Sequence, residues 1–328
     1  MIVQESLLVM LVKLVDRIPM PSSPKKRGRG RPRFYPDGLF LKALVIMMVR
    51  RLHKVHQLLA ALDQPTAEMQ ALRALLRVEG RYPARRTWER RLKAIPESLP
   101  AQIGCLGRYL VALIQPWAAG GCAAALDSTL LRAKGGVWHK KHREQGIVPH
   151  TSIDTEAHWG KSGWHGWVYG WKLHLAVSVA AVWIPLAARL TSANESDNNL
   201  APALIEELPL EPDLFVLGDL QYNAPNVLQA CQHKRRTLVT TQYGPYPHTD
   251  DGVNVRRVFH QLRHRAIENF NEQFKAIFDA HGQVPTKGLI NTQRFALGAV
   301  FVYQLALLCR FEHELDLRVG LKAFLDAA

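Results

Sequence analysis

The sequence has only four cysteines in 328 residues, and no two of them are closely spaced. Neither a CxxC pair nor a CxxC…HxxxH pattern occurs, so the chain offers no cysteine zinc site. We expect the cysteines to be small buried residues of a protein in a reducing compartment. They are Cys105, Cys122, Cys231 and Cys309.

Long hydrophobic runs are also missing, since no stretch reaches the roughly 18 apolar residues of a membrane helix. The first twenty residues carry charges within the apolar pattern, which indicates an amphipathic helix and not a signal peptide. The most apolar run, residues 295–309, contains Gln304 and is short, so we expect a buried core helix. The sequence therefore predicts a cytoplasmic protein with no membrane partner.

Acidic residues are scarce relative to basic ones. Asp and Glu total 28 against 42 Lys and Arg, which gives a formal net charge of +14. Such a charge favours a polyanionic partner, and nucleic acid is the first candidate, although ribosome-associated and membrane-surface proteins share this property. The length and the 48% hydrophobic content predict a large core and two domains.

Residues 1–118 are expected to form an all-α domain, because apolar residues repeat near every 3.6 positions and no strand pattern is evident. A basic segment rich in glycine and proline interrupts this region, and we expect an extended arm at residues 25–33. The arm carries six cations, Lys25, Lys26, Arg27, Arg29, Arg31 and Arg33.

From residue 119 onward the pattern changes to an α/β type. Three β-rich runs at residues 122–131, 168–179 and 182–190 predict consecutive antiparallel strands. Alternating helix and strand patterns follow, with the last two helices beginning near residues 263 and 291. The fold class is therefore α/β, with a mixed five-stranded sheet in a domain spanning residues 119–328.

Two aspartates stand at the ends of predicted buried strands. Asp127 follows the apolar run 123–126, and Asp219 follows the run 214–217. A carboxylate in this position points into the crevice at the edge of the sheet, where open α/β folds bind ligands. A single strand-end aspartate is more often a helix or turn cap, so neither residue is assigned on position alone.

A later helix offers a third acid. On this helix Ile267, Phe270 and Phe274 gather on one side, together with Ile277 and Phe278. The opposite side carries Arg265, Glu268, Glu272 and Lys275. Helix geometry alone favours a solvated face with internal ion pairs.

Over residues 120–310 the chain resembles the DDE transposases of bacterial insertion sequences. The matching pieces are Ala-Leu-Asp127-Ser-Thr, the block from Gly160 to His174 that contains Lys172, Leu-Gly-Asp219 with Tyr222 and Asn223, and the helix with Glu268 and Lys275. The family pattern of the last helix is Y-x2-R-x3-E-x6-K. Here the E-x6-K spacing is kept, but Gln261 replaces the tyrosine and His264 the arginine, with Arg265 one position further on.

The resemblance implies an RNase H-like catalytic domain that cuts DNA at transposon ends and joins the 3′-OH to target DNA. Asp127, Asp219 and Glu268 would be the catalytic residues and would hold two Mg²⁺ ions, with Mn²⁺ as a substitute. The implied partner is double-stranded DNA, as terminal inverted repeats and as target, bound by a homodimer near the nucleoid. Lys275, Arg265 and Lys172 would contact this DNA.

Two further basic segments are candidates for DNA binding. Arg27, Arg29, Arg31 and Arg33 resemble an AT-hook arm in a minor groove, although a solvated linker has the same composition. Residues 83–92 can open the recognition helix of a helix-turn-helix, with Arg85, Arg86, Arg90 and Arg91 meeting phosphates or bases. An exposed arginine-rich helix is an equal alternative.

Residues 134–171 hold five of the eight tryptophans among lysines and arginines, a mixture suited to stacking on distorted DNA. Some of these tryptophans are expected in the core. Histidines in the same segment leave a zinc site as a minor alternative. At the level of function, two alternatives remain: a domesticated repressor that binds DNA without cutting, and an RNase H-like nuclease that only hydrolyses.

Overall fold

The first part of the chain is helical, as its apolar periodicity predicts. The computed structural model describes residues 5–21, 34–114, 123–163, 166–209, 214–241 and 255–328. The N-terminal elements are α1 (Leu7–Leu14), α2 (Asp37–Val49), α3 (Val55–Leu62), α4 (Ala67–Leu75), α5 (Arg85–Ala94), the 3₁₀ turn η1 (Ile95–Glu97) and α6 (Leu99–Ile114). Side-chain caps begin two of them, because the hydroxyls of Ser6 and Thr66 accept the amides of Val9 and Met69.

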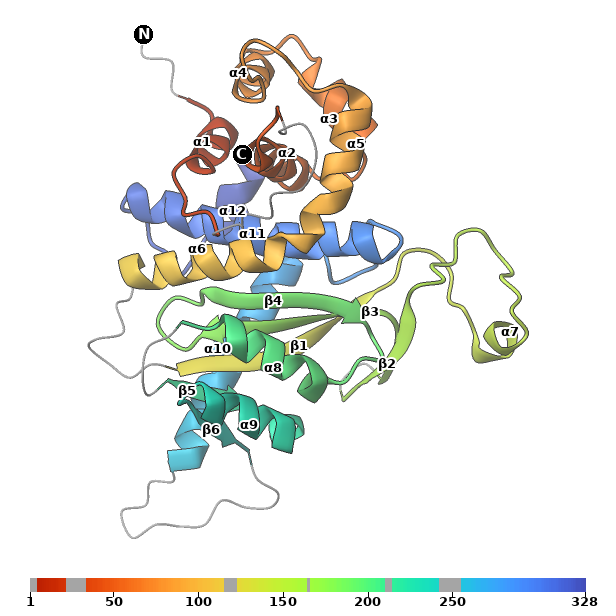
Figure 1. Ribbon diagram of the computed structural model, residues 1–328, viewed down its shortest axis with the longest axis vertical. Helices are drawn as coiled ribbons and strands as arrows, with labels where there is room; N and C mark the ends of the chain where they lie inside the picture. Colours follow the sequence, from red (N-terminus) through yellow and green to blue (C-terminus); the bar gives the residue numbers. More distant parts are fainter. Residues whose placement is uncertain (1–4, 22–33, 115–122, 164–165, 210–213, 242–254) are drawn as a thin grey trace.

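The second part of the chain is built on one mixed sheet (Figure 1). Its strands are β1 (Ala123–Arg132), β2 (His158–Ser162), β3 (Gly166–Ser178), β4 (Pro185–Ser192), β5 (Phe215–Gly218) and β6 (Thr237–Thr240). Strand β3 pairs antiparallel with β1 and β4, whereas β5 is parallel to both β1 and β6. Three antiparallel strands followed by two parallel ones form the RNase H-like arrangement, so the predicted α/β class is confirmed.

The sheet has six strands, and the prediction of five was wrong. Strands β2 and β4 share one edge of β3, because β2 pairs with its first residues and β4 with the remainder. Gly170 shows this directly, since it lies between Arg132 on one side and His158 on the other. Strand β2 is short and polar, and its sequence has no alternating pattern. It forms because β3 is long enough to offer its first residues as a pairing edge.

Helices cover both faces of the sheet. The helices of this part of the chain are α7 (Lys140–Glu144), α8 (Asp197–Glu207), α9 (Pro225–His233), α10 (Val255–Ile277), α11 (Leu289–Glu312) and α12 (Leu321–Asp326), with the 3₁₀ turn η3 (Leu220–Tyr222) after β5. Of these, α7 lies away from the sheet in a projecting arm, and α12 packs on α10 and α11. In Figure 1, α8 lies in front of the sheet and α10 passes behind it. Helix α10 begins at Val255, earlier than the predicted residue 263, and its first turns continue the helical spacing of apolar residues with Val258, Phe259 and Leu262.

Helix α11 is the core of the molecule and contacts α1, α2, α6 and β4. Its length and apolar composition would suffice to cross a membrane, yet 89% of its most apolar window is buried inside the protein. Gln304 within it donates to the carbonyls of Ile103 (2.9 Å) and Pro185 (2.8 Å), which ties α6 to β4. Nearby, a Cβ on Gly107 would lie 2.4 Å from the Pro185 oxygen, so glycine permits this close approach.

The hydrophobic core runs without a break from the N-terminal helices to the sheet. The proposed division at residue 118 therefore stays a prediction about function and not a visible gap in packing. The three described cysteines are free, with Cys231 and Cys309 buried and Cys105 half-buried, whereas Cys122 lies outside the described residues.

Candidate active site

Asp127 stands on β1 directly after the buried residues 124–126. The prediction that it ends its strand was wrong, because β1 continues to Arg132 through its antiparallel pairing with β3. Burial raises the pKa of its carboxyl from 3.8 to about 7. The charge of Arg263 and a hydrogen bond from the Ser128 amide oppose this rise, whereas Asp219 and Asp197 add to it. The Asp127 carboxyl is therefore largely buried, and the positive charge around it is too small to keep it ionised below about pH 7.

Asp219 lies level with Asp127 on the neighbouring strand. The parallel register pairs Ala125 with Leu217, and each aspartate stands two residues further along its strand. The Asp219 carboxylate accepts the Gln221 amide at 2.9 Å and so begins the turn η3. The two candidate aspartates predicted from sequence are therefore brought to the same edge of the sheet.

Tyr222 fills the space beneath these carboxylates. The Tyr222 side chain is fully buried. A Cβ added to Gly218 would lie 2.6 Å from the Cβ of Tyr222, so the glycine before Asp219 makes room for the tyrosine ring. Burial raises the pKa of the tyrosine hydroxyl, and the charges of Asp197, Asp127 and Asp219 raise it further. Tyr222 is consequently a neutral hydroxyl beside three acids.

Asp197 is an acid that the sequence analysis missed. It begins α8, and its Oδ1 lies 3.2 Å from Nδ1 of the buried His174 and 3.4 Å from Nζ of Lys172. Burial raises the pKa of Asp197, but hydrogen bonds from His174 and Ser128 and the charge of Lys172 outweigh it, so the net direction is downward. His174 Nε2 in turn lies 2.9 Å from the Thr191 hydroxyl. Asp197 is therefore held as an anion next to the strand ends.

Helix α10 adds cations to this edge. Arg263 is buried and is the strongest positive influence on Asp127. Lys275, three turns further on, is half-buried; burial lowers the pKa of its ammonium, and the charges of Glu272 and Asp127 partly offset that effect. The two residues lie in one i, i+4 row of the helix that also contains Asn271, whose buried Oδ1 has no partner within the described residues.

Glu268 lies at the rim of this site and does not touch the two aspartates. Its side chain is 51% exposed and pairs with His264 at 2.7 Å. Burial lowers the pKa of His260, followed by the charges of Arg263 and His264, whereas the charges of Glu268 and Asp219 raise it, so His260 is near enough to both acids to feel their charge. Within the described residues, no three His, Cys, Asp or Glu side chains gather closely enough to hold a metal ion.

Asp127 and Asp219 determine whether this site can hold a divalent cation. Asp127 and Asp219 are hard oxygen donors at the same level, and the high pKa of Asp127 shows that a cation there would relieve an uncompensated carboxylate. The pair fits Mg²⁺. Glu268 stands on the correct side of α10, 20° around the helix from Lys275, but its carboxylate is turned toward His264.

The other residues predicted to meet DNA are distributed differently. Arg265 is exposed on the side of α10 away from the acids, so Arg263 is the arginine that faces them. Lys172 is largely buried, and its Nζ donates to the Glu195 carbonyl at 2.7 Å, which makes it an internal partner of the loop before α8. Arg263 lies on the apolar side of α10. Its position in the helical pattern therefore predicts that the arginine side chain is buried.

The arginine-rich segment forms α5, anchored by the buried side chains of Trp88 and Leu92. Arg85, Arg86 and Arg90 are exposed. Arg91 is not: it pairs with Asp37, donates to the Tyr35 carbonyl and lies 4.5 Å over the Phe40 ring, so it holds α5 to α2. Arg27, Arg29, Arg31 and Arg33 lie outside the described residues.

The tryptophan-rich segment projects from the sheet as an arm containing α7 (Figure 1). Trp171 is a core residue, and Trp159 packs against Tyr169 with ring centroids 5.5 Å apart. Trp138 is fixed by its indole N–H, which donates to the Ile147 carbonyl at 2.8 Å. Trp167 is 65% exposed and is available for stacking. Histidine clusters that could hold zinc are absent from the described part of the arm.

The order of the strands, with Asp127 in the middle of β1 and Asp219 directly after β5, defines an RNase H-like domain. Residues 118–305 match the family model of the transposase DDE domain, so the chain belongs to that family. No curated protein matches the chain.

Among solved structures, the chain aligns with two transposases. A piggyBac transposase synaptic complex with hairpin DNA aligns with a TM-score of 0.42 and 10% identity, over 96% of this chain and 74% of that one. A Mos1 transposase paired-end complex with the left transposon end aligns with a TM-score of 0.24 and 14% identity, over 87% of this chain and 82% of that one.

Proposed function

We propose that this transposase is encoded by a bacterial insertion sequence and that it cuts the DNA at the element's ends and joins the 3′-OH to target DNA. The proposal rests on Asp127 and Asp219, which lie at the same level on neighbouring strands and beside the cations of α10. A homodimer acting in the cytoplasm on nucleoid DNA fits the large positive charge.

Each residue of the site has a role in this chemistry. Asp127 and Asp219 would hold Mg²⁺, and Glu268 would complete the set after turning from His264. When bound, two Mg²⁺ ions neutralise charge on the reacting phosphate and lower the pKa of the attacking hydroxyl or water. Arg263 offsets the negative charge around Asp127, and Lys275 grips a phosphate of the DNA beside it.

Binding of the terminal inverted repeats is assigned to the N-terminal region. The exposed face of α5 carries Arg85, Arg86 and Arg90, which would meet phosphates or base edges. The basic arm at residues 25–33 would add minor-groove contacts. The exposed Arg265 would contact DNA from the outer side of α10.

The test is a cleavage and joining assay on labelled duplexes that carry the element's own ends. We expect Asp127→Ala, Asp219→Ala and Glu268→Ala each to abolish cutting and joining while end binding persists. Mn²⁺ should replace Mg²⁺, whereas Ca²⁺ should support binding with little chemistry. The matched control is Glu272→Ala, an exposed acid one helical turn after Glu268.

Three outcomes would contradict parts of this proposal. Normal cutting by the Asp127 and Asp219 variants would overturn the active site itself. Retained joining in Glu268→Ala with loss in Glu272→Ala would move the third role to Glu272. Release of ends without any joining would make the enzyme a nuclease.

A further inference from the structure

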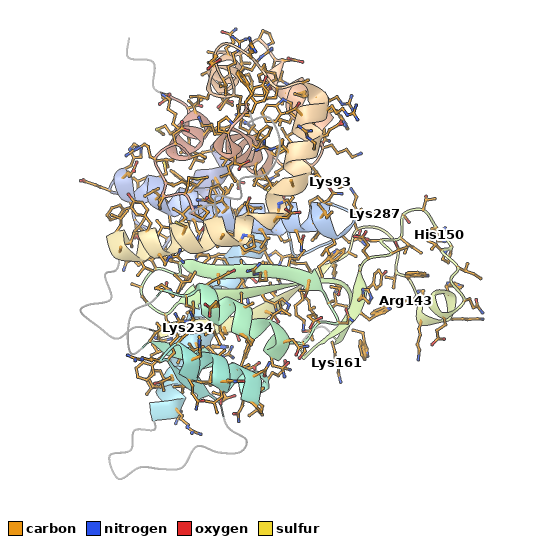
Figure 2. The ribbon with its side chains drawn as sticks, viewed as in Figure 1. Lys93, Arg143, His150, Lys161, Lys234 and Lys287 are labelled. Atoms are coloured by element: carbon orange, nitrogen blue, oxygen red, sulfur yellow. The ribbon has the colours of Figure 1, made fainter. Side chains whose placement is uncertain are left out.

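A second basic feature lies apart from the carboxylates, where the N-terminal helices meet the base of the arm. It is an open groove of about 810 Å³. One wall is formed by residues 53–56 and by α5, and the other by residues 134–135, 152–156 and 285–291. Figure 2 shows Lys93 of α5 and Lys287 of the opposite wall side by side above this junction.

The groove is strongly positive. Its lining contains five Lys and Arg side chains, namely Lys54, Lys93, Lys134, Lys287 and Arg294. Only two carboxylates line it, and both are engaged: Glu89 pairs with Arg85 at 2.8 Å, and Glu156 accepts the Leu289 amide. The pKa of His53 is lowered first by burial and then by the positive charges of Lys134 and Arg294.

The same cations brace the groove: two lysines hold the second wall together, and Arg294 joins it to the first wall. Lys134 Nζ donates to the Pro285 carbonyl at 2.8 Å, and Lys287 Nζ donates to the Thr151 carbonyl at 2.6 Å. Arg294 donates to the His53 carbonyl at 3.1 Å and so links α11 to the opposite wall. Each lysine has three N–H donors and uses one here, so both keep donors for a ligand while their positions are fixed.

These features select the class of ligand. Fixed ammonium groups in a groove open to solvent suit the phosphates of a nucleic-acid backbone. The described lining contains no Phe, Tyr or Trp, and its two histidines, His53 and His56, are the only described rings there on which unpaired bases could stack. Double-helical DNA, which presents only its backbone to such a groove, is therefore favoured over a single strand.

We propose that this groove binds the sugar–phosphate backbone of duplex DNA between α5 and the catalytic domain. The proposal rests on the proposed function, and it adds a contact surface separate from the site that cuts. In this arrangement a DNA end held by α5 is also held by residues of the catalytic domain. Recognition and positioning of the substrate then share one continuous positive surface.

The experiment measures binding alone, in EDTA, so that it is independent of catalysis. The probe is a fluorescein-labelled duplex of about 40 base pairs of arbitrary sequence, titrated by anisotropy between about 50 and 200 mM KCl. Each lost phosphate contact lowers the slope of log K against log salt by about 0.9, so Lys54→Ala/Lys93→Ala should lower it by about 2. The control is Lys234→Ala on α9, whose lysine pairs with Glu206 away from the groove.

The expected result is a reduced slope for the double variant and an unchanged slope for Lys234→Ala, with both proteins keeping the wild-type melting temperature. A double-variant slope equal to that of wild type would overturn the groove assignment. Tighter binding of duplex RNA than of duplex DNA, lost in the same variant, would also overturn it. Cleavage that still depends on Asp127 in either case would show that only the groove, and not the proposed function, had failed.

Discussion

Replacing Asp127 by asparagine should stabilise the metal-free protein at pH 8 while it abolishes DNA cutting. The native fold holds a buried carboxyl at this position whose pKa is raised from 3.8 to about 7. Asparagine has the same shape and can still accept the Ser128 amide, but it carries no charge. The substitution therefore removes the cost of burying an anion and little else.

The magnitude and the sign follow from proton linkage. The native carboxyl binds its proton more tightly than the unfolded one, so wild-type stability falls as the pH rises from about 4 to about 7 and then levels off. A rise in pKa from 3.8 to about 7 corresponds to a ceiling of about 4 kcal/mol, at about 1.36 kcal/mol per pH unit. Because the residue as a whole keeps part of its surface exposed to solvent, we expect Asp127→Asn to gain about 2–4 kcal/mol at pH 8, less than or equal to this ceiling.

The assay is urea unfolding in EDTA at pH 8 and pH 5, followed by the fluorescence of the eight tryptophans. The advantage of the variant should shrink at pH 5, where the wild-type carboxyl is protonated in the native state. Glu272→Gln, at an exposed position on α10, should change stability by less than about 0.5 kcal/mol at either pH. Added Mg²⁺ should stabilise wild type at pH 8 and have little effect on Asp127→Asn.

Two results would refute this reasoning. One is an Asp127→Asn protein that is no more stable than wild type at pH 8. The other is a gain of the same size at both pH values, because a charge effect must disappear when the charge does.

Four further substitutions test the surroundings of the site. Lys275→Ala should reduce end cleavage and strand transfer together by about 10- to 100-fold with unchanged Mg²⁺ affinity, and a normal cutting rate would detach the lysine from catalysis. Arg263→Gln removes the main charge that lowers the pKa of Asp127, so the rise of cleavage rate with pH should move to higher pH; an unmoved profile would contradict this. Asp197→Asn leaves the Lys172 ammonium without an anion and weakens the contact with the buried His174, so it should cost about 1–3 kcal/mol in urea unfolding, whereas an unchanged midpoint would show that the pairing adds nothing. Gly107→Ala should destabilise the protein by about 1–3 kcal/mol, since its Cβ would meet the Pro185 carbonyl, and unaltered stability would mean that α6 can shift freely on β4.

The two aspartates could be predicted because their signal is local, although Asp127 stands in the middle of β1 and not at its end. Asp127 and Asp219 each end an apolar run, and the order of the runs places them on neighbouring strands. Strand β2 could not be predicted in this way. Its residues, His158–Ser162, contain no alternation, and the strand exists only because β3 extends past β4 and offers a free edge.

The cations and the extra acid show a different limit. Arg263 and Arg265 both precede Glu268, and motif spacing drew attention to Arg265, whereas the helical wheel places Arg263 on the buried side. Asp197 gave no signal of its own, because an aspartate at the start of a helix is ordinarily a cap. Its partners, His174 and Lys172, come from β3, and only the tertiary register brings them to it.

The buried position of α11 has a consequence for how the chain is made. The N-terminal helices α1, α2 and α6 emerge from the ribosome first, but the surface on which they pack belongs to α11, which is translated after the whole sheet. Until then their apolar faces have no complete core to cover them. The nascent chain should therefore complete its fold late, and an interrupted translation product should be degraded or aggregate instead of competing with the full-length protein for DNA.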